Sequence, residues 1–211
     1  MAESQGAAQV VSNPPKSPFG DDKPIREHLD HQPVSARVPE KIGRGVYSTG
    51  QLVLDSPKEF VIDFLQGMTR PHQIGARVVI TPQTMAEFIG ALQQNLENYS
   101  QAFGAPPLLP QPPQQPRPTI QEIYENFKLP DEQLSGSYAN SVLIGHSPTE
   151  FFFDFITGFY PTPAVSSRVF LAASHVPRFL NMLKTCLEQY QNRASRPPEP
   201  PAPPLPPPPN V

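Results

Sequence analysis

One short phrase occurs twice in the chain and decides how it is organised: SPKEFVIDF at residues 56–64 and SPTEFFFDF at residues 147–155. Ser, Pro, Glu, Phe and Asp keep their places in both copies. A shift of about 91 residues extends the match without a gap from Gly45 on Gly136 to Tyr99 on Tyr190, with roughly 17 identical pairs. The chain therefore contains a tandem duplication.

Each copy is predicted to form three strands and a helix. In the first copy the strands are GVYSTGQLVLDS (45–56), EFVIDF (59–64) and ARVVI (76–80). The Ser-Pro pair ends the first strand, because proline cannot donate a hydrogen bond to a neighbouring strand. The connections between the strands are short, which favours an antiparallel meander.

Period-two alternation assigns the strand residues to two sheet faces. Phe60, Ile62 and Phe64 fall on one face, where we expect the helix to pack. The same face is predicted to carry Leu52, Leu54, Val78 and Ile80. The second face is not cleanly polar, as a solvated face would be. Its apolar residues are predicted to be Val53, Val61 and Val79 in the first copy and Val142, Ile144, Phe152 and Phe170 in the second.

The helix of each copy follows from a change of period. Thr81-Pro82 is typical of an N-cap followed by proline at the first helical position, and Gly104 is typical of a helix end. Apolar residues then recur at three- and four-residue steps. The stripe consists of Met85, Phe88, Ile89, Leu92, Leu96, Tyr99 and Phe103 in the first copy and of Val176, Phe179, Leu180, Leu183, Leu187 and Tyr190 in the second.

These patterns predict an α+β fold. A three-stranded unit of about 60 residues buries too little apolar surface to be stable by itself, and the second face of each sheet is apolar. We therefore expect the two β-β-β-α repeats to pack together as an intramolecular pseudo-dimer of antiparallel sheets with packed helices, joined through those second faces.

The second face also carries a repeated set of charged residues. Two carboxylates beside an arginine suit a ligand site or acid/base chemistry, and they equally suit an ion-pair network that fixes how the copies meet. We favour the ion-pair network, because no nucleophile, histidine or glycine loop accompanies the set in both copies. The set is Glu59, Asp63 and Arg77 in the first copy and Glu150, Asp154 and Arg168 in the second.

The strings YANSVLIGHSPTEFFFDF (138–155) and SRVFLAASHVPRFLNMLKTCLEQY (167–190) resemble a family of small bacterial and archaeal proteins known as domain of unknown function 3467. The resemblance covers residues 45–104 and 136–190. It implies a covalent version of a dimer and brings no activity, substrate or catalytic residue. The first copy has Ser48-Thr49 where the second has Ala139-Asn140, so the role of Asn140 is expected to be filled only once.

The sequence predicts five segments along the chain. They are a disordered arm (1–42), repeat 1 (43–104), a Pro-rich linker with a short helix near 119–128 (105–135), repeat 2 (136–192) and a Pro-rich disordered tail (193–211). Thr119 and Glu122 have the spacing of a capping box at the start of the short helix. We expect this helix to dock on the repeat core, and a partner-binding helix is the alternative.

Composition narrows the classes of function. The net charge of -3 leaves no basic stripe for nucleic acid, which disfavours nucleic acid as a partner. The 31 prolines indicate that much of the chain lies outside the packed core. The lone Cys186 fits a reducing, cytoplasmic compartment. We read no export signal and no membrane span.

The expected function is that of a non-enzymatic interaction or assembly protein with another protein as its partner, and further self-association stays open. We predict no catalytic residue, no metal site and no cofactor. The alternative is a ligand-binding module that uses the repeated Glu/Asp/Arg face, with Asn140 as a further contact.

Overall fold

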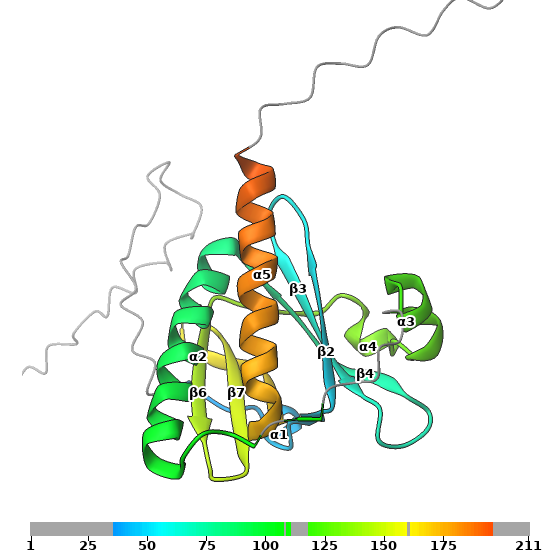
Figure 1. Ribbon diagram of the computed structural model, residues 1–211. Coiled ribbons are helices and arrows are strands. Elements are labelled where there is room, and N and C mark those ends of the chain that lie inside the picture. Colours follow the sequence, from blue (N-terminus) through cyan, green and yellow to red (C-terminus); the bar gives the residue numbers. More distant parts are fainter. Residues whose placement is uncertain (1–35, 108, 111–117, 160, 196–211) are drawn as a thin grey trace, which may run out of the picture. The chain divides into compact units, whose positions relative to one another are not determined.

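A computed structural model of the chain describes residues 36–107, 109–110, 118–159 and 161–195 (Figure 1). The disorder predicted for residues 1–35 and 196–211 concerns segments outside these ranges. Residues 36–42, which the sequence places in the disordered N-terminal arm, include most of the short helix α1 (Glu40–Gly43). Residues 193–194, which it places in the disordered tail, form the end of the helix α5 (Val176–Ala194), so the predicted bounds of both segments are wrong.

Each repeat contributes four strands, one more than the sequence predicts. In the first repeat they are β1 (Val46–Ser48), β2 (Gly50–Asp55), β3 (Phe60–Gln66) and β4 (Gln73–Ile80). In the second they are β5 (Ser137–Ala139), β6 (Ser141–His146), β7 (Glu150–Thr157) and β8 (Ala164–Ala172). The predicted first strand is broken in both repeats, after Ser48 and after Ala139.

The broken strands exchange partners between the repeats. We call the sheet with strand order β2-β3-β4-β5 sheet 1 and the sheet with order β1-β8-β7-β6 sheet 2. Within each repeat the three long strands form the predicted antiparallel meander. The short strand β5 pairs in parallel with β4 of the first repeat, and β1 pairs in parallel with β8 of the second. The pseudo-dimer of α+β repeats is thus confirmed, and its halves are interlocked.

The break shifts the alternation of faces by one residue. Before the break the even-numbered residues face the core: Val46 packs against it and Ser48 is buried. After the break the odd-numbered residues do so, since Val53, opposite Ile62, packs on the core. The same shift occurs at Asn140. The prediction assumed that side chains alternate between the two faces without interruption along the whole first strand. Because the strand breaks and the alternation shifts, the predicted faces are wrong for five residues: Leu52, Val53, Leu54, Val142 and Ile144.

The long helices are α2 (Pro82–Phe103) and α5 (Val176–Ala194), and a 3-10 turn (Ala173–His175) precedes α5. The Thr81 side chain accepts a hydrogen bond from the Thr84 N–H, as the N-cap prediction requires. Gly104 ends α2 with a φ of 85°, a value that glycine adopts without strain. The helices pack side by side (Figure 1).

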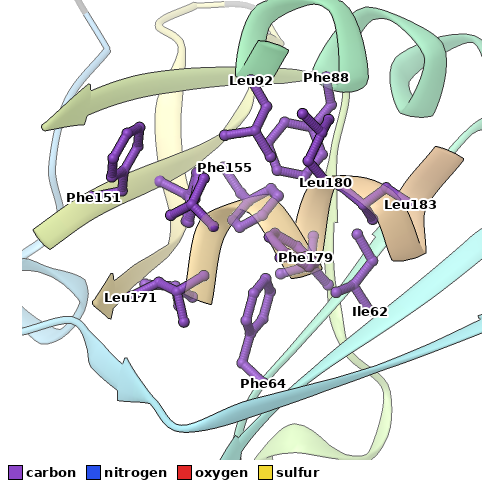
Figure 2. Close-up of a cluster of buried hydrophobic side chains, with 14 of the residues drawn as sticks. Ile62, Phe64, Phe88, Leu92, Phe151, Phe155, Leu171, Phe179, Leu180 and Leu183 are labelled. Carbon is purple, nitrogen blue, oxygen red and sulfur yellow. The ribbon is translucent and has the colours of Figure 1, made fainter. Parts of the chain in front are cut away.

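The helices and the inner faces of both sheets enclose one aromatic core (Figure 2). The ring of Phe64 in β3 lies 5.6 Å from that of Phe155 in β7 and 5.8 Å from that of Phe179 in α5. Phe88 of α2 contacts Phe155 across the repeat boundary, with ring centroids 5.6 Å apart. Phe60, Phe64 and Phe151 are fully buried, as the sequence predicts for this face.

The copies therefore meet through the face that carries these phenylalanines and through the exchanged strands. The prediction that they meet through the second faces is wrong. The apolar residues that remain on those faces, among them Val61, Phe152 and Phe170, are half-buried, and each second face points away from the core.

Candidate functional site: the outer faces of the two sheets

The outer face of each sheet, opposite the aromatic core, carries one buried carboxylate. On sheet 1 this is Asp63, which lies opposite Arg77 in the β3–β4 register. Arg77 Nε donates to Asp63 Oδ1 at 2.7 Å and Arg77 Nη2 to Oδ2 at 2.8 Å. Such two-point pairs fix both geometry and charge. The hydrogen bond to Asp63 raises the pKa of the Arg77 guanidinium, against the opposing effect of burial.

Sheet 2 repeats this pair with Asp154 and Arg168. Arg168 Nε donates to Asp154 Oδ1 and Nη2 donates to Oδ2, both at 2.6 Å. The bond to Asp154 likewise raises the pKa of Arg168. Asp154 is almost fully buried, and the Arg168 side chain is 23% exposed. Both arginines thus stay charged and pair within their own repeats.

Each arginine also contacts the segment that precedes the exchanged strand on its own sheet. Arg77 Nη1 donates to the carbonyl oxygen of Leu134 at 3.2 Å, at the end of the short helix α4 (Asp131–Leu134) that precedes β5. Arg168 Nη1 contacts the carbonyl oxygen of Gly43 at 3.5 Å, just before β1. The Asp–Arg pairs therefore hold the segments that lead into the exchanged strands.

The glutamates of the predicted set lie apart from these pairs. Glu150 is four residues from Asp154 along β7, and its carboxylate accepts from the hydroxyls of Ser147 and Thr149 in the preceding turn. These bonds, chiefly the one from Thr149, lower the pKa of Glu150. Glu59 precedes β3, in the equivalent turn, where its backbone N–H donates to Ser56 Oγ. The structure brings together a repeated pair, Asp and Arg, and leaves Glu59 in the turn before β3 and Glu150 at the first position of β7.

Asn140 lies at the crossover from β5 to β6, where its Oδ1 accepts from the Gly158 N–H at 2.8 Å. At the crossover of the first repeat, Thr49 Oγ1 accepts from the Gly67 N–H at 2.9 Å. The expectation that the role of Asn140 is filled only once is therefore wrong. A threonine hydroxyl and an asparagine carbonyl both supply the oxygen that ties the crossover to the end of the neighbouring strand.

The short helix that the sequence predicts in the linker docks on the repeats, as expected, and it does so on the outer face of sheet 1. The helix α3 (Ile120–Asn126) begins with the predicted capping box between Thr119 and Glu122. From α3 the Tyr124 hydroxyl donates to Asp63 Oδ2 at 2.6 Å and accepts from Arg77 Nη2 at 2.8 Å. Burial and the neighbouring Asp63 raise the pKa of Tyr124 to about 12. Tyr124 thus completes the site on sheet 1 as an uncharged phenol.

A second contact fixes the end of this segment. The ring of Phe127 lies 5.3 Å from that of His72, and Lys128 pairs in parallel with Gln73 beside it. In Figure 1 α3 and α4 accordingly lie beside β4. The sequence indicated this docking because Tyr124 and Phe127 share one face of the helix. It did not indicate that their partners are Asp63 and His72.

Sheet 2 presents aromatic rings where sheet 1 has valines. Phe152 and Phe170 occupy the places of Val61 and Val79, with ring centroids 6.5 Å apart. Both rings lie over glycines: a Cβ on Gly145 would come within 2.2 Å of Phe152, and one on Gly45 within 2.4 Å of Phe170. Tyr47, paired with Phe170, is 43% exposed. These three rings and the Asp154–Arg168 pair form what we call the sheet 2 platform.

The duplication is also visible in a family comparison. Residues 2–107 and 110–195 each match the family described as "Protein of unknown function (DUF3467)". The chain belongs to this family. It contains two tandem DUF3467 copies, as the resemblance implies, and each match includes the residues before the exchanged strand as well as the repeat itself. No curated protein matches the chain.

None of the helices that the structure describes in this DUF3467 pair is long and apolar enough to cross a membrane. The described residues likewise contain no group of three or more His, Cys, Asp or Glu side chains placed to hold a metal ion. Burial, with a smaller effect from Arg178, lowers the pKa of His175 at the start of α5.

Proposed function

We propose that this DUF3467 pair is a non-enzymatic interaction or assembly protein and that the sheet 2 platform binds a partner protein. One observation supports the proposal. Sheet 1 uses its Asp–Arg pair to hold a helical segment, α3, through a tyrosine hydroxyl. Sheet 2 carries the same pair, and the residues that the structure describes include no counterpart of α3 beside it.

The docked α3 helix indicates the chemistry of the partner. A short amphipathic segment would place an aromatic hydroxyl on the oxygen of Asp154 and apolar side chains against Phe152 and Phe170. Partly exposed aromatic rings around a fixed arginine are typical of the residues that dominate binding energy in protein interfaces. The aromatic rings of sheet 2 offer more apolar surface than the valines of sheet 1, which suits binding between separate chains.

The experiment compares retention of proteins from the native cell lysate by three forms of the full chain. The test variant carries Phe152→Val and Phe170→Val, which give sheet 2 the residues that sheet 1 already tolerates. The control carries Val61→Thr and Val79→Thr on the outer face of sheet 1. We expect the parent and the control to retain the same partner, and the test variant to retain about tenfold less of it, as for the loss of an interface hot spot.

Equal retention by the test variant and the parent would refute the platform as the binding surface. Residues 1–35 of the chain itself are the competing occupant. If they cover the platform, the parent retains no partner, whereas a chain beginning at residue 36 does.

The ligand-binding alternative rests on the same pair. A small molecule held by Asp154 and Arg168 would bind the parent and the variant with Phe152→Val and Phe170→Val alike, and neither form would retain a partner protein. A cytoplasmic location belongs to this proposal and is supported by the single cysteine, Cys186.

A further inference from the structure

The two long helices end in equivalent contacts, so the two ends of the pseudo-dimer can be compared directly. Tyr99 of α2 donates its hydroxyl to the carbonyl of Pro148 at 2.7 Å, and Tyr190 of α5 donates to that of Pro57 at 3.1 Å. The rings of Tyr99 and Tyr190 each lie 5.2 Å from a core phenylalanine, Phe151 and Phe60 respectively. Each helix therefore closes over the hairpin turn of the other repeat.

At the α2 end aromatic rings lie next to the tyrosine, and the outermost of them, Phe103, is 48% exposed. Phe103 lies 5.3 Å from Tyr99 and 6.1 Å from His146, measured between ring centroids. His146 in turn lies 5.1 Å from Phe151. The side chain of Phe103 thus covers the β6–β7 hairpin, with the imidazole beneath it.

At the α5 end the corresponding residues are small or charged. The repeat shift places Ala194 at the position of Phe103, and Asp55 at that of His146. A pocket of about 390 Å³ lies there, lined by Asp55, Ser56, Pro57, Tyr190, Arg193 and Ala194. In Figure 1 this is where the C-terminal end of α5 lies beside the hairpin between β2 and β3.

Two charged residues, Arg193 and Asp55, line the pocket at the α5 end, whereas aromatic rings lie at the α2 end. Arg193 takes the position of Ala102 and pairs with Asp55 through Nη2. The Arg193 side chain is 53% exposed and that of Asp55 26%. A guanidinium has five N–H donors, and the described contacts use Nη2 alone.

We propose that this pocket binds a ligand that carries a phenyl ring and a carboxylate a few bonds away. The ring takes the place that Phe103 fills at the other end, between Tyr190, Pro57 and Ala194. The carboxylate accepts hydrogen bonds from the guanidinium donors of Arg193 that Asp55 leaves free. The volume falls within the range of about 300–1,000 Å³ that is usual for small-molecule sites.

Two sources of this chemistry exist, a free aromatic acid and the C-terminal phenylalanine of another protein. Both present a ring and a carboxylate with similar spacing. The pocket belongs to the α5 end of the molecule and shares no residue with the sheet 2 platform, so either proposal can fail without the other.

The test is a titration of the ¹⁵N-labelled full chain with sodium 3-phenylpropionate, followed by amide chemical shifts. We expect saturable shifts confined to the β2–β3 turn and to residues near Arg193. Two matched probes separate ring from charge: butyrate lacks the ring, and 3-phenylpropylammonium reverses the charge. Both should bind at least about tenfold more weakly, because each loses one of the two anchoring groups.

Two variants locate the site. Ala194→Phe gives the α5 end the residue that fills the α2 end, and it should abolish the shifts while the rest of the amide spectrum stays unchanged. Arg193→Ala should weaken 3-phenylpropionate about tenfold or more and remove its advantage over 3-phenylpropylammonium. The second variant keeps the test decisive if Ala194→Phe fails to fold.

The equivalent position at the α2 end provides a control. Phe103→Ala should open the equivalent space beside His146, and that new site should not prefer carboxylates because Ala102 replaces the arginine. The source arm uses a peptide ending in phenylalanine and its C-terminal amide. Tighter binding of the free-acid peptide than of 3-phenylpropionate assigns a protein C-terminus, and equal binding assigns a free acid.

Three results would each overturn the proposal. The first is the absence of saturable shifts at the α5 end, and the second is undiminished binding of 3-phenylpropionate by Ala194→Phe or Arg193→Ala. The third is tighter binding of 3-phenylpropylammonium than of 3-phenylpropionate.

Discussion

Asp63 and Asp154 are the buried carboxylates among the residues that the structure describes. Their positions explain why both repeats have the same aspartate, the same arginine and the same register between the strands that carry them. Each occupies the central strand of its meander, directly opposite its arginine. A buried carboxylate without a partner is costly, so the strand register is tied to the pair. The arginine of each pair also contacts the segment before the exchanged strand, through the carbonyl of Leu134 or of Gly43.

Removing the arginine from either pair is expected to destabilise the protein. Arg168→Ala leaves Asp154 without a charged partner, and Arg77→Ala leaves Asp63 with the Tyr124 hydroxyl as its side-chain donor. We expect each to lower the free energy of unfolding by about 3–5 kcal/mol, as for a buried pair that loses one member. Denaturant midpoints of the parent and both variants would measure the loss.

The exposed Arg178 provides the control for these variants. Arg178→Ala should change the free energy of unfolding by no more than about 0.5 kcal/mol. If Arg168→Ala and Arg77→Ala behaved like this control, the pairs would not hold the exchanged segments, and a role in ligand binding would gain support.

At the scale of elements, α3 shows how tertiary contacts make a marginal helix stable. It has only seven residues, and isolated helices shorter than about 12–15 residues are marginal in water. The capping box supplies a start, and Tyr124 and Phe127 supply the docking contacts. The helix therefore depends on the outer face of sheet 1.

This dependence predicts a loss of stability at high pH. The folded pKa of Tyr124 is about 12, above the usual value of about 10 in an unfolded chain. The folded state thus holds the phenol proton more tightly, and this stabilisation is complete below about pH 10 and is lost as the pH rises through about 12. Urea unfolding between pH 9 and 11.5 should show a steeper loss for the parent than for Tyr124→Phe.

The tyrosine absorbance at 295 nm provides an independent readout. Tyr124→Phe should remove a late component of the phenolate titration and leave the earlier components in place. Identical pH slopes and identical titrations for parent and variant would show that the Tyr124 phenol is not held by Asp63.

At the scale of the whole molecule, strand exchange makes each repeat incomplete. Sheet 1 needs β5 from the second repeat, sheet 2 needs β1 from the first, and both helices contribute to one core. The two copies therefore share one folding unit, although the sequence divides them cleanly.

We expect neither half to fold as a monomer. Residues 36–107 and 118–195, produced separately, should be unfolded or should associate, whereas an equimolar mixture should give one folded complex of both halves. Light scattering would give the masses, and circular dichroism would show whether cooperative melting returns on mixing. A single half that melts cooperatively as a monomer would contradict the interlocked fold.

Sequence alone determined the duplication, the meander, the helix caps and the buried faces of the central strands and helices. These features are encoded locally: the alternation of Phe60, Ile62 and Phe64 and the Thr81-Pro82 cap each depend on neighbours along the chain. For the candidate site, the sequence identified the aspartates and arginines because they occur at equivalent positions in both copies. It also grouped the glutamates with them wrongly, because side chains that share a sheet face can still lie several residues apart along a strand.

Only the tertiary structure decided the exchange of β1 and β5, the face of Leu52 and the docking of Tyr124 on Asp63. The first strand looks continuous in the sequence, yet Thr49 and Asn140 turn the backbone from one sheet to the other and so shift the alternation by one residue. A three-residue strand pairs with any suitable edge nearby, and its partner is chosen by the packing of the whole molecule. The physical reason is that periodicity specifies which way a side chain points, whereas pairing between distant segments depends on which edges and faces the folded chain brings together.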